Sequence, residues 1–254
     1  MKTNPVRQKL ASGKPVYGFY TSFNSPDLLE FCGHLNFEWC WLDAEHAPLT
    51  PETAAHLVRA CETAGVVPML RVAENDPKHI LGFLEIGMMG IEVPHIDTAD
   101  DARRAVDAIR YAPHGRRGAG SQTRAANFGL TQTAPEYFAQ ANREVLFIAL
   151  VESKTGFDSL AEILAVDGVD VIALGSGDLA MSMGLPGQVG HPTVQAMVRR
   201  AEEQVVASGK TLEALVANAE EARAAVARGA RFISIGVSTM LRSAGRSFFE
   251  GLPI

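Results

Sequence analysis

Charged and imidazole side chains follow several apolar runs of this sequence, each at the point where a run ends. They are Asp43, Glu45, His46, Arg71, Glu152 and Asp178. If the runs are parallel β-strands, their carboxyl ends meet at one rim and these side chains converge there. A single charged residue at a strand end is often only a helix cap or half of a surface ion pair. If all of these residues had such roles, they should be found at both ends of the fold. Their convergence on one rim instead favours a catalytic site.

Glu152 and Asp178 are the strongest candidates for holding a cation. They follow consecutive predicted strands, and no histidine or cysteine stands beside them. Such a pair suits a hard divalent ion such as magnesium, manganese or cobalt, bound by oxygen ligands with positions left for water and substrate. The alternative is that the two carboxylates share a proton or pair with arginines.

The turn from Gly175 to Leu179 joins a predicted strand to a short helix. Glycine at positions 175 and 177 lets backbone amides approach an anion at the positive end of that helix, so a substrate carboxylate could bind there. By itself, a Gly-x-Gly turn more often serves only the backbone geometry.

His46 and Arg71 are the candidates for moving a proton and for stabilising negative charge. His46 lies three residues after Asp43, close enough for that carboxylate to fix the imidazole tautomer and raise its basicity, as a general base requires. Arg71 supplies positive charge where an enolate oxygen develops. The other histidines are interpreted as structural: His34, His56, His79, His95, His114 and His191.

Eight apolar runs rich in β-branched and aromatic residues alternate with helical patterns and predict the elements that position these groups. The predicted strands are residues 16–23, 38–42, 67–72, 90–93, 145–151, 171–174, 211–216 and 232–236. The predicted helices are residues 26–33, 51–64, 77–86, 99–109, 156–164, 193–208 and 219–228. Eight βα units predict a (β/α)8 TIM barrel, one α/β domain over residues 1–254. An open doubly wound sheet is the alternative, but no GxGxxG turn follows the first strand.

The composition argues against several other classes of protein. The formal net charge is -6, so the chain offers no basic surface for nucleic acid. Residues 1–15 lack the apolar stretch of a signal peptide and no segment approaches membrane-spanning length, so we expect a cytoplasmic protein that does not bind a membrane. Cys32, Cys40 and Cys61 form no CxxC pair and are interpreted as reduced, buried packing residues.

Several longer stretches are familiar as a set. They are residues 37–48 (FEWCWLDAEHAP), 110–118 (RYAPHGRRG), 151–155 (VESKT), and 166–170 (VDGVD) with 175–179 (GSGDL). Together they resemble the HpcH/HpaI aldolase family, the class II pyruvate aldolases. The similarity runs over nearly the whole chain in one register, which makes it more specific than any single motif.

The resemblance implies a set of roles for residues of this chain. Glu152 and Asp178 would hold the metal, which a 2-oxo acid chelates, with the substrate carboxylate also on the amides of Gly177 and Asp178. Arg71 would stabilise the enolate, and His46, oriented by Asp43, would move the proton through a water. Glu45 lies in the same loop, and Leu215 matches a position that lines the aldehyde pocket. The resemblance also implies a last helix packed on a neighbouring subunit and a homohexamer built as a trimer of dimers.

The chain departs from the family pattern at five positions. Ser176 and Gly177 stand where the family usually has proline and alanine, which should loosen the carboxylate-binding turn. Leu150 replaces a glutamine, and Glu92 and Glu213 place carboxylates where relatives tend to carry apolar or small residues. These changes leave the metal and base residues in place but put the substrate in doubt.

The leading hypothesis is metal-dependent cleavage or formation of a 4-hydroxy-2-oxo acid from a pyruvate-like 2-oxo acid and an aldehyde. A second hypothesis keeps the enolisation but uses another electrophile, as a citrate synthase does. A third is a Schiff-base aldolase, because Lys154 follows Glu152 by two residues. A fourth, from another class, is a non-catalytic sensor that binds a 2-oxo acid.

Overall fold

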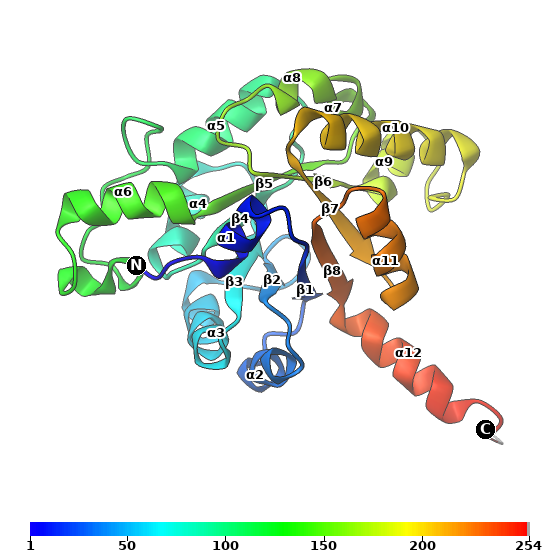
Figure 1. Ribbon diagram of the computed structural model, residues 1–254, viewed down its shortest axis with the longest axis horizontal. Coiled ribbons are helices and arrows are strands. Elements are labelled where there is room, and N and C mark those ends of the chain that lie inside the picture. Colours follow the sequence, from blue (N-terminus) through cyan, green and yellow to red (C-terminus); the bar gives the residue numbers. More distant parts are fainter. Residues whose placement is uncertain (253–254) are drawn as a thin grey trace.

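The chain folds into a closed barrel of eight parallel strands that follow one another in sequence order (Figure 1). β8 pairs with β1 and closes the barrel, which confirms the predicted (β/α)8 architecture. The computed structural model describes residues 1–252, so the last two residues of the predicted 1–254 domain lie outside the described residues. The strands are β1 (Val16–Thr21), β2 (Trp39–Asp43), β3 (Val67–Arg71), β4 (Gly90–Val93), β5 (Leu146–Val151), β6 (Val171–Leu174), β7 (Thr211–Val216) and β8 (Phe232–Gly236).

Helices connect the strands and cover the outside of the barrel, except that the last helix extends away from it (Figure 1). No helix within residues 1–252 combines the length and the apolarity that crossing a bilayer requires. The helices are α1 (Pro5–Ala11), α2 (Pro26–His34), α3 (Pro51–Ala64), α4 (Pro77–Glu85), α5 (Ala99–Ile109), the 3-10 helix η1 (Arg124–Gly129), α6 (Ala134–Glu144), α7 (Lys154–Asp158), α8 (Leu160–Leu164), α9 (Ser176–Ser182), α10 (Pro192–Ser208), α11 (Ala219–Ala227) and α12 (Val237–Phe249).

Capping residues explain why the sequence located most helix ends. In α3, the Thr50 side chain accepts a hydrogen bond from the amide of Thr53, and Pro51 occupies the first turn. Both features satisfy or avoid the free amides at a helix start. Gly65 ends the helix in the left-handed conformation, with a φ of 73°, which glycine adopts without steric cost.

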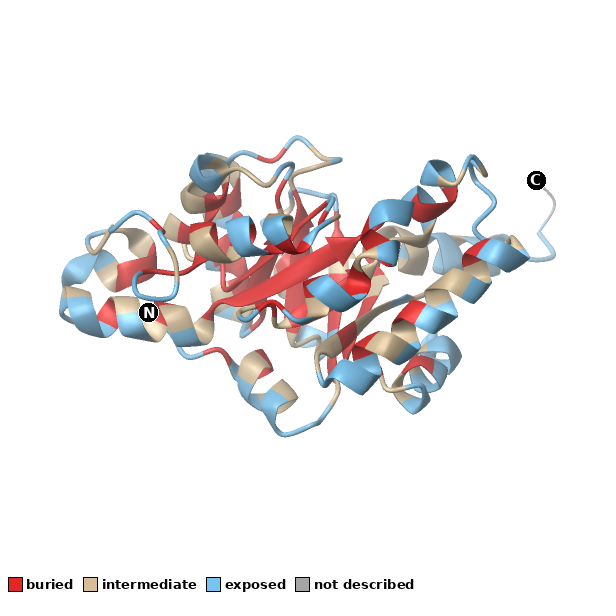
Figure 2. Cartoon of the chain, turned by 90° about the horizontal axis from the view of Figure 1, so that it is seen from above, coloured by how far each residue is buried: buried red, intermediate tan, exposed pale blue. Residues whose placement is uncertain are grey.

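Two apolar layers hold the barrel together. Alternation along each strand sends one set of side chains toward the helices, as with Phe19 and Leu70, and the other set into the barrel. Inside, the rings of Trp39 and Phe232 stack with centroids 3.9 Å apart. Buried residues are concentrated on the strands (Figure 2). The cysteines are buried, as predicted.

Several segments differ from the expected elements, because α6 and η1 also lie outside the predicted helices. The predicted helix over residues 156–164 is two helices, α7 and α8, divided at Ser159. Helix α1, which the sequence did not predict, lies on the amino-terminal side of the barrel because buried Asn4 donates to the carbonyls of Met89 and Glu144, at 3.3 and 2.9 Å. Tertiary hydrogen bonds fix this short helix, since seven residues are too few for helix propensity alone.

The register of neighbouring strands places polar residues side by side at the carboxyl end. Asp43 of β2 pairs with Arg71 of β3, and Arg71 pairs with Glu92 of β4. Residues paired in this way share one face of the sheet. The closed barrel therefore places a positively charged arginine between two carboxyl side chains on three adjacent strands.

Candidate active site

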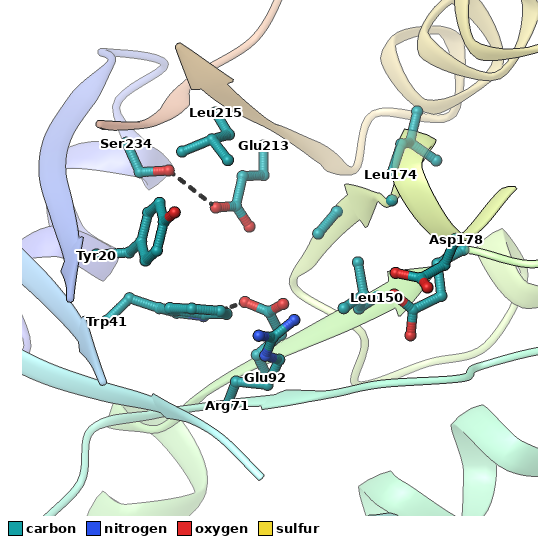
Figure 3. Close-up of a pocket in the computed structure, with 13 residues that line it drawn as sticks. Tyr20, Trp41, Arg71, Glu92, Leu150, Leu174, Asp178, Glu213, Leu215 and Ser234 are labelled. Carbon is teal, nitrogen blue, oxygen red and sulfur yellow. Dashed lines mark hydrogen bonds between the residues drawn. The ribbon is translucent and has the colours of Figure 1, made fainter. Parts of the chain in front are cut away.

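A cavity of about 240 Å³ lies at the carboxyl ends of the strands (Figure 3). This is the end at which (β/α)8 enzymes carry out their chemistry. Residues of all eight strands or of the turns that follow them line the cavity, together with the start of α9. The lining residues that bear on chemistry are Arg71, Glu92, Glu152, Asp178, Glu213 and Leu215.

Arg71 is fixed by a two-pronged bond to Asp43. Its Nε and Nη2 donate to the two carboxylate oxygens of Asp43 at 3.2 and 3.0 Å, and its guanidinium lies 4.6 Å from the ring centre of Trp41. Burial would raise the pKa of Asp43, but the hydrogen bonds and charge of Arg71 outweigh it and lower that pKa. Asp43 is therefore a permanent anion that holds Arg71 charged and oriented.

His46 does not bond to Asp43 through its imidazole, which corrects one expectation. Asp43 instead accepts from the backbone amides of Glu45 and His46, at 3.1 and 3.2 Å, and so shapes the loop that carries them. The imidazole is 67% exposed, and its Nε2 lies 3.8 Å from Glu45 Oε2. Three residues of sequence separation allowed the predicted contact, but Arg71 and two amides already occupy the Asp43 carboxylate.

Glu45, His95 and Glu152 form a compact group of ligand atoms at the rim. One donor atom from each lies within 4.8 Å of the other two. His95 adopts a left-handed backbone with a φ of 51°, and its amide donates to Glu152 Oε1 at 3.0 Å while its Nδ1 lies 3.4 Å from the same oxygen. The interpretation of His95 as structural is therefore corrected. Its place two residues after the end of β4 was the signal that could have identified it.

The carboxylates of this rim lack the positive charge needed to balance them. Burial raises the pKa of Glu152, and the charges of Asp178 and Glu45 raise it further against the opposing effect of His95. Glu45 Oε2 lies 3.0 Å from Arg71 Nε, yet it is buried and accepts no hydrogen bond within residues 1–252. Oxygen donors crowded in this way fit a divalent cation.

Gly175 allows the end of β6 to approach Glu152. A Cβ at this position would lie 2.5 Å from the Glu152 Cβ, so any side chain here would displace the carboxylate. Gly177 and Asp178 follow in the first turn of α9. The first amides of a helix have no partner within it. Asp178 lines the cavity, whereas Gly177 does not.

Leu215 lies at the cavity, as expected from the sequence, whereas Lys154 does not. Leu215 lines the cavity and is 61% exposed. Lys154 begins α7 and pairs on the surface with Asp158, Nζ to Oδ2 at 2.5 Å. It does not line the cavity, so the structure contradicts the Schiff-base alternative that depended on Lys154.

Glu92 and Glu213 add two acids to the cavity, at positions where the sequence departs from the family pattern. Both line the inner wall of the cavity (Figure 3). Burial and the charge of Glu213 raise the pKa of Glu92 well above its usual range, against the effects of Arg71 and Trp41. Burial raises the pKa of Glu213 to about 7, although Ser234 and Arg71 act in the opposite direction.

A closed βα barrel with these groups around one cavity defines a (β/α)8-barrel enzyme with an acidic, cation-fitting site. The family model described as HpcH/HpaI aldolase/citrate lyase matches residues 16–244. The chain belongs to that family. Membership makes it a carbon–carbon lyase of the aldolase type.

Individual relatives agree with this assignment over almost the whole chain. A 2-keto-3-deoxy-L-rhamnonate aldolase of Escherichia coli O17:K52:H18 (strain UMN026 / ExPEC) is 36% identical over 242 residues, covering 95% of this chain and 90% of the relative. The crystal structure of an HpcH/HpaI aldolase/citrate lyase family protein from Burkholderia cenocepacia J2315 superposes with a TM-score of 0.91 at 31% identity, covering 98% of both chains. Citrate synthase SbnG superposes with a TM-score of 0.85 at 29% identity, covering 96% of both chains.

Proposed function

We propose that this chain cleaves and forms 4-hydroxy-2-oxo acids, with a pyruvate-like 2-oxo acid and an aldehyde as the two components. The observation that carries the proposal is the convergence of unbalanced carboxylates and a fixed arginine on one cavity. The carboxylates suit a divalent cation that binds a 2-oxo acid, and the arginine suits an enolate oxygen. The named aldolase relative supports the same chemistry.

Glu152 and Asp178 would hold the metal, with Glu45 and His95 close enough to Glu152 to add donors. Magnesium, manganese and cobalt all fit a site of this composition. A bound divalent ion would act as a Lewis acid that polarises the keto oxygen of the substrate. The amides of Gly177 and Asp178 would bind the substrate carboxylate.

Arg71 would stabilise the negative charge of the enolate, and His46 would transfer the proton. Arg71 Nη1 makes no hydrogen bond within residues 1–252, whereas Nε and Nη2 are held by Asp43. Nη1 can therefore donate to the oxygen that becomes an enolate. His46 would accept the proton of the C4 hydroxyl, directly or through a water, since its imidazole is exposed at the rim.

Cleavage of the substrate would follow from these roles. As the C4 hydroxyl loses its proton, the C3–C4 bond breaks, the aldehyde leaves, and the electron pair becomes the enolate of the 2-oxo acid. Protonation of C3 gives the product methyl group. Leu215, exposed at the cavity mouth, would contact the departing aldehyde.

Chelation tests the proposal directly. Treatment with a chelator should abolish cleavage of a 4-hydroxy-2-oxo acid, and added manganese or magnesium should restore it. Exchange of the pyruvate methyl protons into deuterated water reports the enolisation without an aldehyde. Full cleavage in chelator rejects the metal-dependent mechanism, and pyruvate binding without exchange indicates a sensor.

The likeness to citrate synthase SbnG favours one second candidate, in which the enolate attacks a different electrophile. The same cavity would enolise the 2-oxo acid, and an acyl thioester would replace the aldehyde. Comparing aldehydes with acyl thioesters as acceptors distinguishes the two. Turnover only with thioesters would favour the second candidate.

Helix α12 supports a proposal about assembly. Only Val237 of this helix is buried, and it exposes Leu241, Phe248 and Phe249. We propose that α12 packs on a neighbouring copy within a homohexamer, a cytoplasmic trimer of dimers in which residues 1–254 form one domain. The molar mass from analytical ultracentrifugation tests this, and a monomer at micromolar concentration would contradict it.

A further inference from the structure

Glu92 and Glu213 occupy a part of the cavity that the proposed mechanism does not use. Glu92 lies on β4 and Glu213 on β7, with side chains directed into the barrel from different walls (Figure 3). Asp178 lies at the other side of the cavity in the same view. The two glutamates therefore form a second polar surface facing the proposed substrate position.

The neighbours of these glutamates leave hydrogen-bonding capacity unused. Glu92 is 3% exposed, and its Oε2 accepts from Trp41 Nε1. Glu213 Oε1 accepts from Ser234 Oγ at 3.3 Å, whereas its buried Oε2 has no hydrogen-bond partner within residues 1–252. Arg71 does not neutralise either one by direct contact, because its ion pairs are with Asp43 and Glu45.

Packing alone does not explain two acids at this depth. Leu150 and Ala173 line the same cavity and show that apolar side chains fit its inner wall. Replacing buried polar groups together with their partners by apolar groups of similar shape is often neutral or stabilising. An unsatisfied buried carboxyl oxygen in a cavity instead points to a missing polar partner.

The chemistry of the pair identifies the kind of partner. Burial raises the pKa of Glu213 to about 7 and that of Glu92 well above its usual range, which favours a protonated carboxyl in this part of the cavity. A protonated carboxyl donates a hydrogen bond and an ionised one accepts. A hydroxyl group offers the complementary donor and acceptor, whereas a second substrate carboxylate would meet like charge.

We propose that Glu92 and Glu213 form a hydroxyl-binding subsite that makes the enzyme select hydroxylated substrates over alkyl and carboxylated ones. The inference rests on the proposed function, because the occupants of the cavity are then a 2-oxo acid and an aldehyde. The hydroxyl group could belong to either component. Both sources share the same chemistry, and substrate pairs separate them.

Two matched pairs measure the selection. Hydroxypyruvate and 2-oxobutanoate differ by a hydroxyl in place of a methyl, and C3 proton exchange compares them without an aldehyde. Glycolaldehyde and propanal differ in the same way, and kcat/KM with pyruvate compares them. The wild type should prefer the hydroxylated member of at least one pair by about 10-fold to 100-fold, the range for leaving buried polar groups unpaired.

Two substitutions of Glu213 test whether the subsite causes this preference. Glu213→Leu should reduce the ratio at least about tenfold toward equality. Glu213→Gln keeps size and hydrogen bonding but removes the charge, so it should retain most of the hydroxyl preference and turn over succinic semialdehyde faster. Glu203→Leu, the same change on the exposed side of α10, is the control and should leave every ratio unchanged. Because each ratio is internal to one protein, partial loss of folding cancels.

The outcomes distinguish the subsite from the proposed function. Equal use of both members of both pairs by the wild type overturns the subsite, as does an unaltered ratio in Glu213→Leu. If the wild type shows no metal-dependent exchange of pyruvate, the proposed function fails. In that case, calorimetric binding of hydroxypyruvate against 2-oxobutanoate, in the wild type and in Glu213→Leu, still decides the subsite: equal affinities in the wild type, or an unaltered ratio in Glu213→Leu, overturn it.

Discussion

The two ends of the barrel handle buried charge in opposite ways. At the amino-terminal end, Asp170 directly precedes β6 and accepts from Arg7 Nη2 at 2.7 Å, Arg110 Nη2 at 2.8 Å and the amide of Phe147 at 2.9 Å. Each of its oxygens has a partner, and two arginines balance its charge. This network ties α1, α5, β5 and β6 together.

At the carboxyl end, carboxylates outnumber the cations that could balance them. Burial raises the pKa values of Glu92, Glu152 and Glu213, and Arg71 is the guanidinium that lines their cavity. The paired charges at one end connect elements of the fold, whereas incompletely balanced carboxylates in a cavity at the other end are typical of a functional site. The residues that connect elements of the fold and the residues of the candidate active site therefore lie at opposite ends of the barrel axis.

The largest expected effect is the loss of activity in Glu152→Gln. The substitution preserves shape but removes a charge that we propose holds the metal, so kcat/KM should fall about 10³-fold or more. Metal affinity, measured by calorimetry, should fall with it, while the midpoint of chemical unfolding should not decrease. A variant that is less stable but still active would contradict this assignment, because Glu152 would then contribute to stability rather than to catalysis.

Asp170→Asn should have the opposite profile. It leaves buried Arg110 without its charge partner, and we expect a loss of about 3 kcal/mol in the free energy of unfolding. Activity per folded molecule should persist below the unfolding transition. Asp158→Asn, which breaks an exposed pair with Lys154, is the control and should cost less than about 0.5 kcal/mol.

The pH dependence of stability should change in Glu213→Gln. Because the folded-state pKa of Glu213 is raised from 4.5 to about 7, its contribution to stability is complete below pH 4.5 and is lost as the pH rises through 7. A shift of this size corresponds to on the order of 3 kcal/mol. Urea unfolding of the metal-free protein at pH 5 and pH 8 should therefore show a smaller loss in the variant. Parallel profiles would contradict the buried position of this carboxyl.

The smallest effect is expected at Lys154, which is near Glu152 in sequence but outside the cavity. Lys154→Ala removes an exposed ion pair and should change kcat/KM by less than about twofold, since exposed pairs contribute little. Borohydride treatment with pyruvate should leave no covalent adduct on the wild type. An adduct at Lys154 would contradict its position outside the active site.

The local sequence determined the elements of this fold. Strands 90–93, 171–174, 211–216 and 232–236 have the predicted bounds, because apolar runs flanked by turn residues are a local signal. Thr50, Pro51 and Gly65 fixed both ends of α3 for the same reason. Strand ends also identified the cavity residues Arg71, Glu152 and Asp178, because parallel strands in a closed barrel present their carboxyl ends together.

Tertiary structure alone decided which side chains meet. Asp43 and His46 are neighbours in sequence, yet Arg71 from the next strand takes the carboxylate. His95 reaches Glu152 across 57 positions through an unusual backbone conformation. Pairing energies of this kind depend on distance and competition among partners, which become defined only once the barrel closes. Local periodicity placed groups at the rim, and barrel closure determined their partners.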